Sequence, residues 1–123
     1  DKRRALFEFN SESGNFSVQK ITVNDSSEPL GNHYHKRKTE VFVITKGYGY
    51  AVTRRVNPSG EPTEEENYHR PLQPGSVMMI PPYVAHAFLM SEGSELICYS
   101  SEAFDPENND LHPFRLRVKV WER

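Results

Sequence analysis

Short apolar runs separated by turn residues recur along the whole chain. The runs are rich in Val, Ile, Phe and Tyr, and nine prolines and seven glycines punctuate them. Runs with this length and spacing are typical of the strands of an all-β sandwich or barrel. Besides the stretch around residues 30–35, we predict strands over 6–9, 16–23, 40–45, 50–56, 68–72, 76–80, 86–90, 95–100 and 114–121.

In two of these runs, the alternation of side-chain types indicates which face of the strand is buried. In 114–121, Phe and aliphatic residues alternate mainly with Arg and Lys, which predicts a strand with one buried face. That face would pack on the barrel or on a second subunit. In 50–56, alternation separates Ala51 and Thr53 from Tyr50 and Val52. Either set could face inward, and the smaller one would leave room for a ligand.

Length, charge and cysteine content restrict the class of protein. A chain of 123 residues is expected to form a single domain, residues 1–123. The 15 basic and 17 acidic residues nearly balance, so nothing favours a nucleic-acid partner, and no apolar run is long enough to span a bilayer. Cys98 is the single cysteine and lies in an apolar run. We expect a buried thiol and a cytoplasmic protein.

Candidate chemistry is concentrated around two histidines. His33 and His35 are separated by one residue, so in a strand both imidazoles point to the same side and Tyr34 points to the other. Glu40 opens the next apolar run after a short turn, which would bring its carboxylate beside the imidazoles. Imidazole and carboxylate together suit a divalent ion such as zinc, iron, manganese or nickel.

A second stretch, 75–86, contains a Gly turn, an apolar strand, a Pro-Pro turn and His86. The two stretches resemble the two motifs of the cupin superfamily, whose members form one small β-barrel of the jelly-roll type. The resemblance implies that His33, His35, Glu40 and His86 bind one metal ion. Tyr83 and Met90 depart from the usual motif at positions that do not bind metal. A histidine on an apolar strand is more often a satisfied core residue, but the spacing of all four favours the metal site.

A narrower resemblance concerns residues 31–110. Gly31 to His35, Lys38 to Glu40 and the run Phe104-Asp105-Pro106-Glu107-Asn108 are similar to the cupin half of bifunctional capsular-polysaccharide enzymes. Those enzymes act on UDP-linked 4-keto-6-deoxy amino sugars on the route to N-acetylfucosamine. The resemblance implies a small-molecule substrate such as a nucleotide sugar, and an epimerase or isomerase step. Cupins also commonly form homodimers, which we expect here.

The chemistry implied would need a group that moves a proton. Candidates are Lys38 in the basic turn 36–38, Tyr83 beside the second motif, and His69. His69 lies outside the motifs and is left out of the metal set. Because cupins host many activities, two alternatives stay open. One is an iron- or manganese-dependent dioxygenase, and the other is a non-catalytic cupin that binds a sugar or small acid.

Overall fold

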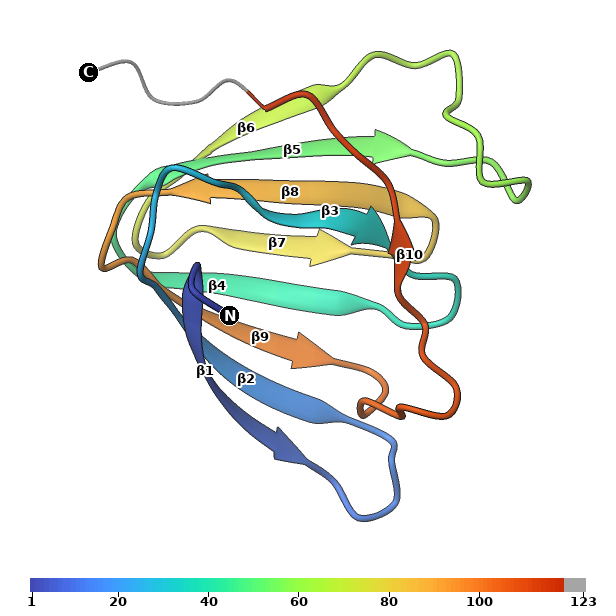
Figure 1. The fold of residues 1–123 in the computed structure, drawn as a ribbon, viewed down its shortest axis with the longest axis horizontal. Helices are drawn as coiled ribbons and strands as arrows, with labels where there is room; N and C mark the ends of the chain where they lie inside the picture. Colours follow the sequence, from blue (N-terminus) through green and yellow to red (C-terminus); the bar gives the residue numbers. More distant parts are fainter. Residues whose placement is uncertain (119–123) are drawn as a thin grey trace.

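The computed structural model describes residues 1–118 and contains ten strands in two antiparallel sheets (Figure 1). The first sheet, called here the β9 sheet after its central strand, has the order β1-β2-β9-β4-β7. Its strands are β1 (Arg4–Asn10), β2 (Ser17–Val23), β4 (Glu40–Lys46), β7 (Val77–Ile80) and β9 (Glu95–Ser100).

The second sheet, called the β8 sheet, has the order β10-β3-β8-β5-β6. Its strands are β3 (Leu30–Tyr34), β5 (Gly49–Arg55), β6 (Tyr68–Leu72), β8 (Val84–Met90) and β10 (His112–Pro113). Successive strands from β4 onward mostly change sheets, so the chain winds back and forth between the two layers (Figure 1). This is the all-β jelly-roll barrel that the sequence predicted. Nowhere in residues 1–118 is there a helix with the length and apolar character needed to cross a membrane.

The space between the sheets holds the main core. Alternation along each strand sends every second side chain into this space, and the buried members form one apolar cluster with the small residue Ala51 among them. Val52, the next residue on β5, points to the other side of the sheet and lies in a second apolar cluster on the outer face of the β8 sheet. The smaller face of β5 therefore points inward, which settles the question left open by its sequence.

The second cluster forms because the C-terminal segment crosses the outer face of the β8 sheet (Figure 1). Leu116 is buried there against Val52 and Ala87, while Arg115 and Arg117 are exposed. The predicted alternation is thus correct for 114–118, but these residues form no strand. The segment lies over a sheet face, where few backbone partners exist: the amides of Phe114 and Leu116 both donate to Asn32. Residues 119–121 of the predicted strand lie outside the described residues.

Candidate metal centre

Two adjacent strands of the β8 sheet and the first residue of β4 bring the predicted ligands together. His33 on β3 is paired in register with His86 on β8. Glu40 opens β4 in the facing sheet, and His35 follows directly after β3. One potential ligand atom from each of the four side chains lies within 4.8 Å of the others. These four residues are called the His/Glu cluster below.

The backbone before His33 is shaped for this pairing. Gly31 has a φ of +94°, and a Cβ at that position would lie 2.6 Å from the carbonyl oxygen of His86. Glycine alone tolerates both the conformation and the close approach. The β3–β8 register then shifts between Gly31 and His33, with Asn32 at a φ of +62°. This irregularity sets His33 directly opposite His86, as bulges beside functional sites commonly do.

Backbone carbonyls fix the orientation of the two most buried imidazoles. Nδ1 of His35 lies 2.6 Å from the carbonyl oxygen of Asp110, and Nδ1 of His86 lies 3.1 Å from that of Val84. A carbonyl oxygen only accepts, so Nδ1 carries the proton in both rings. In the neutral rings, Nε2 then presents a lone pair. A backbone carbonyl on the far nitrogen is the usual support of a metal-binding histidine.

Those lone pairs meet a carboxylate oxygen. Oε1 of Glu40 lies 2.8 Å from Nε2 of His35 and 3.5 Å from Nε2 of His86. All three atoms are buried, and none has a hydrogen-bond partner of good geometry within residues 1–118. Three acceptors held this close need a shared proton or cation, because unpartnered buried polar atoms cost free energy. The residues therefore fit a divalent ion with imidazole and carboxylate ligands.

The protonation states suit a cation better than protonated imidazoles. Burial, together with the neighbouring imidazoles of His86 and His35, lowers the pKa of His33 to about 3. Burial also lowers the pKa of His86. Burial of Glu40 raises its pKa, but its contact with His35 and the electrostatic effect of the other imidazoles and Lys38 outweigh burial and lower the pKa to about 2. At neutral pH these three residues are two neutral imidazoles and an ionised carboxylate, the forms that bind metal.

Two residues that sequence reasoning missed support the cluster. Cys98, buried as expected, lies with its thiol 3.4 Å from Oε2 of Glu40 and can donate to it, which leaves Oε1 facing the imidazoles. The carboxylate of Asp110 accepts hydrogen bonds from three successive backbone amides, those of Lys36, Arg37 and Lys38, at 2.8–3.1 Å. The same residue that orients His35 therefore also holds the turn between His35 and Glu40.

Arg37 and Lys38, both in the basic turn 36–38, interact with different parts of the protein. Arg37 is tied to the C-terminal loop through a 2.6 Å ion pair with Glu102 and a 2.9 Å bond to the carbonyl of Asn108. Lys38 is the predicted base that lies near the cluster, since its positive charge also acts on His33, Glu40 and His86. His69 is exposed on β6 and is not part of the cluster.

Tyr83, the other predicted catalytic residue, lies elsewhere. Its ring stacks on Tyr34 with centroids 6.1 Å apart, in the outer cluster of the β8 sheet. Its backbone amide donates to the carbonyl of His35 at 2.7 Å. The positive φ of 61° at Tyr83 belongs to the turn that makes this contact. The position of the ring in the outer cluster does not support a role for the phenol as a base. The contact that Tyr83 makes near the cluster is the hydrogen bond from its backbone amide to His35.

The space beside the cluster is small. A cavity of about 60 Å³ is lined by His33, Glu40 and His86, by apolar side chains of the barrel interior, and by Arg4 and Gln19. The sequence predicted a strand only from residue 6, but Arg4 is already part of β1. Its position opposite Val23 puts it on the inner face of the sheet. A volume of this size holds an ion with one or two waters.

Comparison with known proteins agrees with this architecture. The family model described as "Polysaccharide biosynthesis C-terminal domain" matches residues 1–112. No curated protein matches the sequence significantly. Among solved structures, the chain is similar to CapF with the inhibitor 3-isopropenyl-tropolone, at a TM-score of 0.78 and 23% identity over 94% of this chain and 33% of that one. It is also similar to CapF, a capsular polysaccharide assembling protein from Staphylococcus aureus, at 0.76 and 22% over 94% and 31%.

A third similar structure is Pac13 from Streptomyces with uridine, at a TM-score of 0.66 and 13% identity over 96% of this chain and 83% of that one. Identities this low show a shared fold, and the chain spans about a third of the CapF chains. The family match covers nearly all of the described residues. The chain has a cupin-type fold related to that of CapF, and it belongs to the polysaccharide biosynthesis C-terminal domain family.

Proposed function

We propose that this protein is a metal-dependent epimerase or isomerase of a nucleotide-linked keto sugar in polysaccharide biosynthesis. The observation that carries the proposal is the trio of buried, unpartnered acceptors formed by His35, Glu40 and His86. Membership of a polysaccharide biosynthesis family supports the pathway. The similar fold of Pac13, described as a nucleoside dehydratase and seen with uridine, supports a substrate with a nucleoside part.

The four residues of the His/Glu cluster would act together as metal ligands. His33, His35, Glu40 and His86 would hold one divalent ion of zinc, nickel, iron or manganese. Such an ion, when bound, would polarise a keto oxygen and stabilise the negative charge that develops on it. The aromatic rings of Phe42 and Phe88 line the cavity beside the cluster, with centroids 4.6 Å apart. Such apolar neighbours lower the local dielectric.

Lys38 is our candidate for moving the proton. The C–H bond beside the carbonyl would break, its electron pair would move toward the carbonyl oxygen, and the side chain of Lys38 in its neutral amine form would accept the proton. Return of the proton to the opposite face of the same carbon gives epimerisation. Isomerisation requires instead that the former carbonyl carbon receives the proton while the hydroxyl on the neighbouring carbon loses its own and becomes the new carbonyl. No net oxidation occurs, so this scheme needs no further reactant. Tyr83 and His69 are not carried forward as bases, because both lie away from the cluster.

The small cavity restricts how such a substrate would bind. About 60 Å³ does not admit a sugar ring, so only the reacting carbonyl edge would reach the cluster and the rest would lie outside. Arg4 lines the same cavity and is partly exposed, with its nearest acidic partner, Asp1, 3.8 Å away. Its guanidinium is suited to an anionic group of the substrate. We place this activity in the cytoplasm and in a homodimer.

The same cavity favours one alternative, a cupin that binds a sugar or small acid through its metal without turnover. The experiment that separates the two is solvent deuterium exchange, followed by NMR, at the carbon next to the keto group of a UDP-linked 4-keto-6-deoxy amino sugar. Metal-loaded wild type should exchange this proton and Lys38→Met should lose most of the rate, with Lys36→Met as the matched control. Saturable binding without exchange would establish the binding module, and substrate-dependent oxygen uptake would establish a dioxygenase.

A further inference from the structure

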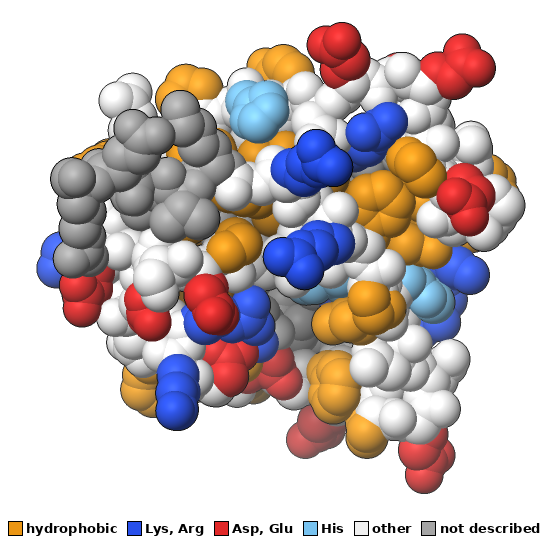
Figure 2. Space-filling model, turned by 45° about the horizontal axis from the view of Figure 1, so that its top comes forward, with side chains coloured by type: hydrophobic (Ala, Val, Ile, Leu, Met, Phe, Trp, Pro, Cys, Tyr) orange, Lys and Arg blue, Asp and Glu red, His pale blue; other side chains and the backbone are white. Residues whose placement is uncertain are grey.

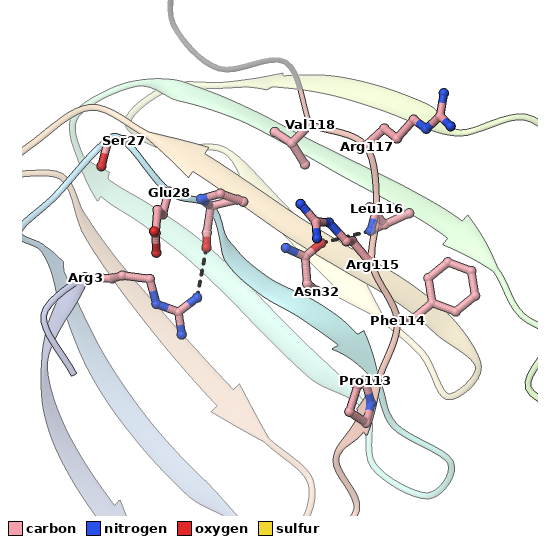
Figure 3. Close-up of a pocket in the computed structure, with 11 residues that line it drawn as sticks. Arg3, Ser27, Glu28, Asn32, Pro113, Phe114, Arg115, Leu116, Arg117 and Val118 are labelled. Carbon is pink, nitrogen blue, oxygen red and sulfur yellow. Dashed lines mark hydrogen bonds between the residues drawn. The ribbon is translucent and has the colours of Figure 1, made fainter.

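A groove lies beside the C-terminal segment, where this segment crosses β3 (Figure 3). Its volume is about 660 Å³, and it is lined by Arg3, residues 27–29, Asn32 and residues 113–118. Pockets for small ligands commonly have volumes of about 300–1,000 Å³. The groove can therefore hold a ligand of nucleotide size, which the cavity of about 60 Å³ at the His/Glu cluster cannot.

The groove adjoins the cavity at the His/Glu cluster. Arg4 lines the cavity, and the preceding residue, Arg3, lines the groove. On β3, Leu30 and Gly31 line the cavity, and Asn32 lines the groove. Arg4 is partly exposed, so the cavity comes close to the surface beside the groove. A ligand that entered the cavity past Arg4 would have its remaining part at the groove.

The lining of the groove carries more positive than negative charge. It contains one carboxylate, that of Glu28, and three guanidinium groups, those of Arg3, Arg115 and Arg117. Within residues 1–118, the acidic group that pairs with any of these arginines is Asp1, whose carboxylate lies 3.0 Å from Arg3. Three positive charges therefore stand against two negative ones, and Figure 2 shows basic side chains near the middle of this side of the molecule. Such a surface attracts an anion.

Two of the arginines are placed to bind the same anion. Nη1 of Arg3 donates to the carbonyl of Pro29 at 3.0 Å, while Nε and Nη2 contact Asp1. These contacts hold the side chain in place, and each Nη carries a second N–H that can bind a ligand. Arg115 has no hydrogen-bond or ion-pair partner within residues 1–118, and Figure 3 shows it extending over Asn32 into the groove. A guanidinium can bind two phosphate oxygens at once.

The rest of the lining suits a nucleoside. Glu28 lies on the same side of the groove as Arg3 (Figure 3) and forms no ion pair within residues 1–118. In dinucleotide sites, a carboxylate accepts hydrogen bonds from ribose hydroxyls. Pro29 and Val118 add apolar surface. Because a carboxylate repels a bare polyphosphate, this mixed lining favours a ligand that carries hydroxyl groups as well as phosphates.

We infer that this groove binds the nucleoside diphosphate part of a nucleotide-linked sugar, with the diphosphate between Arg3 and Arg115 and the ribose hydroxyls at Glu28. The sugar would extend past Arg4 toward the His/Glu cluster. The choice of ligand rests on the function proposed above, but none of the lining residues belongs to the cluster. The groove should therefore bind the nucleotide without metal and without turnover.

Isothermal titration calorimetry of the purified 123-residue chain with UDP tests this inference. Wild type should show saturable binding, and Arg115→Gln should bind about tenfold more weakly or worse, because charge-assisted hydrogen bonds to phosphate are lost. Arg117→Gln is the matched control. It removes the same charge from the same segment, but from a side chain that extends away from Arg3 and Asn32 (Figure 3), and should weaken binding about fivefold or less. Circular dichroism must show that each variant is folded.

Removal of metal ions with a chelator separates this inference from the proposed reaction. UDP should bind equally well before and after removal, and UDP binding without proton exchange on the keto sugar would contradict the epimerase proposal alone. No saturable UDP binding at millimolar concentrations would overturn the inference, as would equal losses in Arg115→Gln and Arg117→Gln. Loss of UDP binding with the metal would place UDP at the cluster instead. Pyrophosphate that binds as tightly as UDP would overturn the assignment to a nucleoside diphosphate.

Discussion

The two ends of the barrel interior are built on the same strands but bury opposite chemistry. Along β4 the inward side chains change from Glu40 at one end to Ile44 at the other, and along β8 they change from His86 to Met90. Strand β9 contributes Leu96, paired with Ile44, at the aliphatic end. All five side chains are buried. A distance of four residues therefore separates an ionisable environment from an aliphatic one.

This difference separates the source of stability from the source of function. The aliphatic end stabilises the fold because it removes apolar area from water, about 25 cal/mol for each Å². The polar end costs stability in the metal-free protein, because its acceptors are buried without partners. The rings of Phe42 and Phe88 lie between the two ends. Changes at the two ends should accordingly affect different measurements.

The largest expected effect on folding is at the aliphatic end. Leu96 is fully buried, so Leu96→Ala leaves a cavity and should lower the free energy of unfolding by about 2–5 kcal/mol. The metal affinity of the folded protein should stay the same, because Leu96 lines the cavity beside the cluster but is not one of the four proposed ligands. Urea denaturation and a metal titration on one preparation measure the two quantities. Ile97→Ala on the half-buried outer side is the control and should cost less.

The second prediction concerns pH at the polar end. Folding lowers the pKa of His33 from 6.5 to about 3, so the unfolded chain binds more protons below pH 6.5 and stability falls as pH falls. Between pH 6.5 and 4.5 Glu40 stays ionised in both states, because its folded pKa is near 2 and its usual value 4.5. The loss in this window should be about 2–3 kcal/mol from His33.

Denaturation of metal-free protein at several pH values measures this loss. His33→Gln should flatten the dependence, while His69→Gln, at an exposed position, should leave it unchanged. An unchanged slope in His33→Gln would mean that His33 is not held neutral by the fold. Stability that rises as the solution is acidified would contradict the arrangement of the polar end as a whole.

The third and smallest predicted effect lies in the support of the cluster. Asp110→Ala removes the carboxylate that accepts three amide hydrogen bonds from the turn 36–38. We expect metal affinity to fall about 10–100-fold, the usual consequence of losing an outer partner of a metal ligand. Competition with a chelator measures it. Asp110→Asn, which keeps an acceptor oxygen, should recover part of the loss, and equal defects in both variants would argue against this role.

The sequence predicted the His/Glu cluster because its signals are local. His33, His35 and Glu40 lie within eight positions, and strand alternation places the two imidazoles on one side. His86 was found through motif spacing. Asp110 was missed because it orients His35 from 75 positions away through a backbone carbonyl, which no side-chain pattern reveals. The placement of Arg4 in the cavity depends on the register of β1 with β2, which a single strand does not encode.

The structure differs from the sequence predictions at two other places, and each difference has a physical reason. The alternation in 114–118 predicted the buried side correctly but not the absence of a strand, because strand formation requires a neighbouring edge and alternation requires only a surface to cover. Tyr83 was predicted as a candidate for moving the proton from its position beside the second motif. The turn that holds it has a positive φ, which sends its ring to the outer face instead.

The central claim is that the cluster binds a divalent ion, and metal content tests it most directly. The chain should be purified without a metal-affinity tag and analysed by mass spectrometry of its metals, beside His86→Gln and the exposed-site control His69→Gln. The account predicts one ion per chain in wild type and in His69→Gln, and its loss in His86→Gln. Folded wild-type protein that contains no metal and takes up none on titration would contradict it.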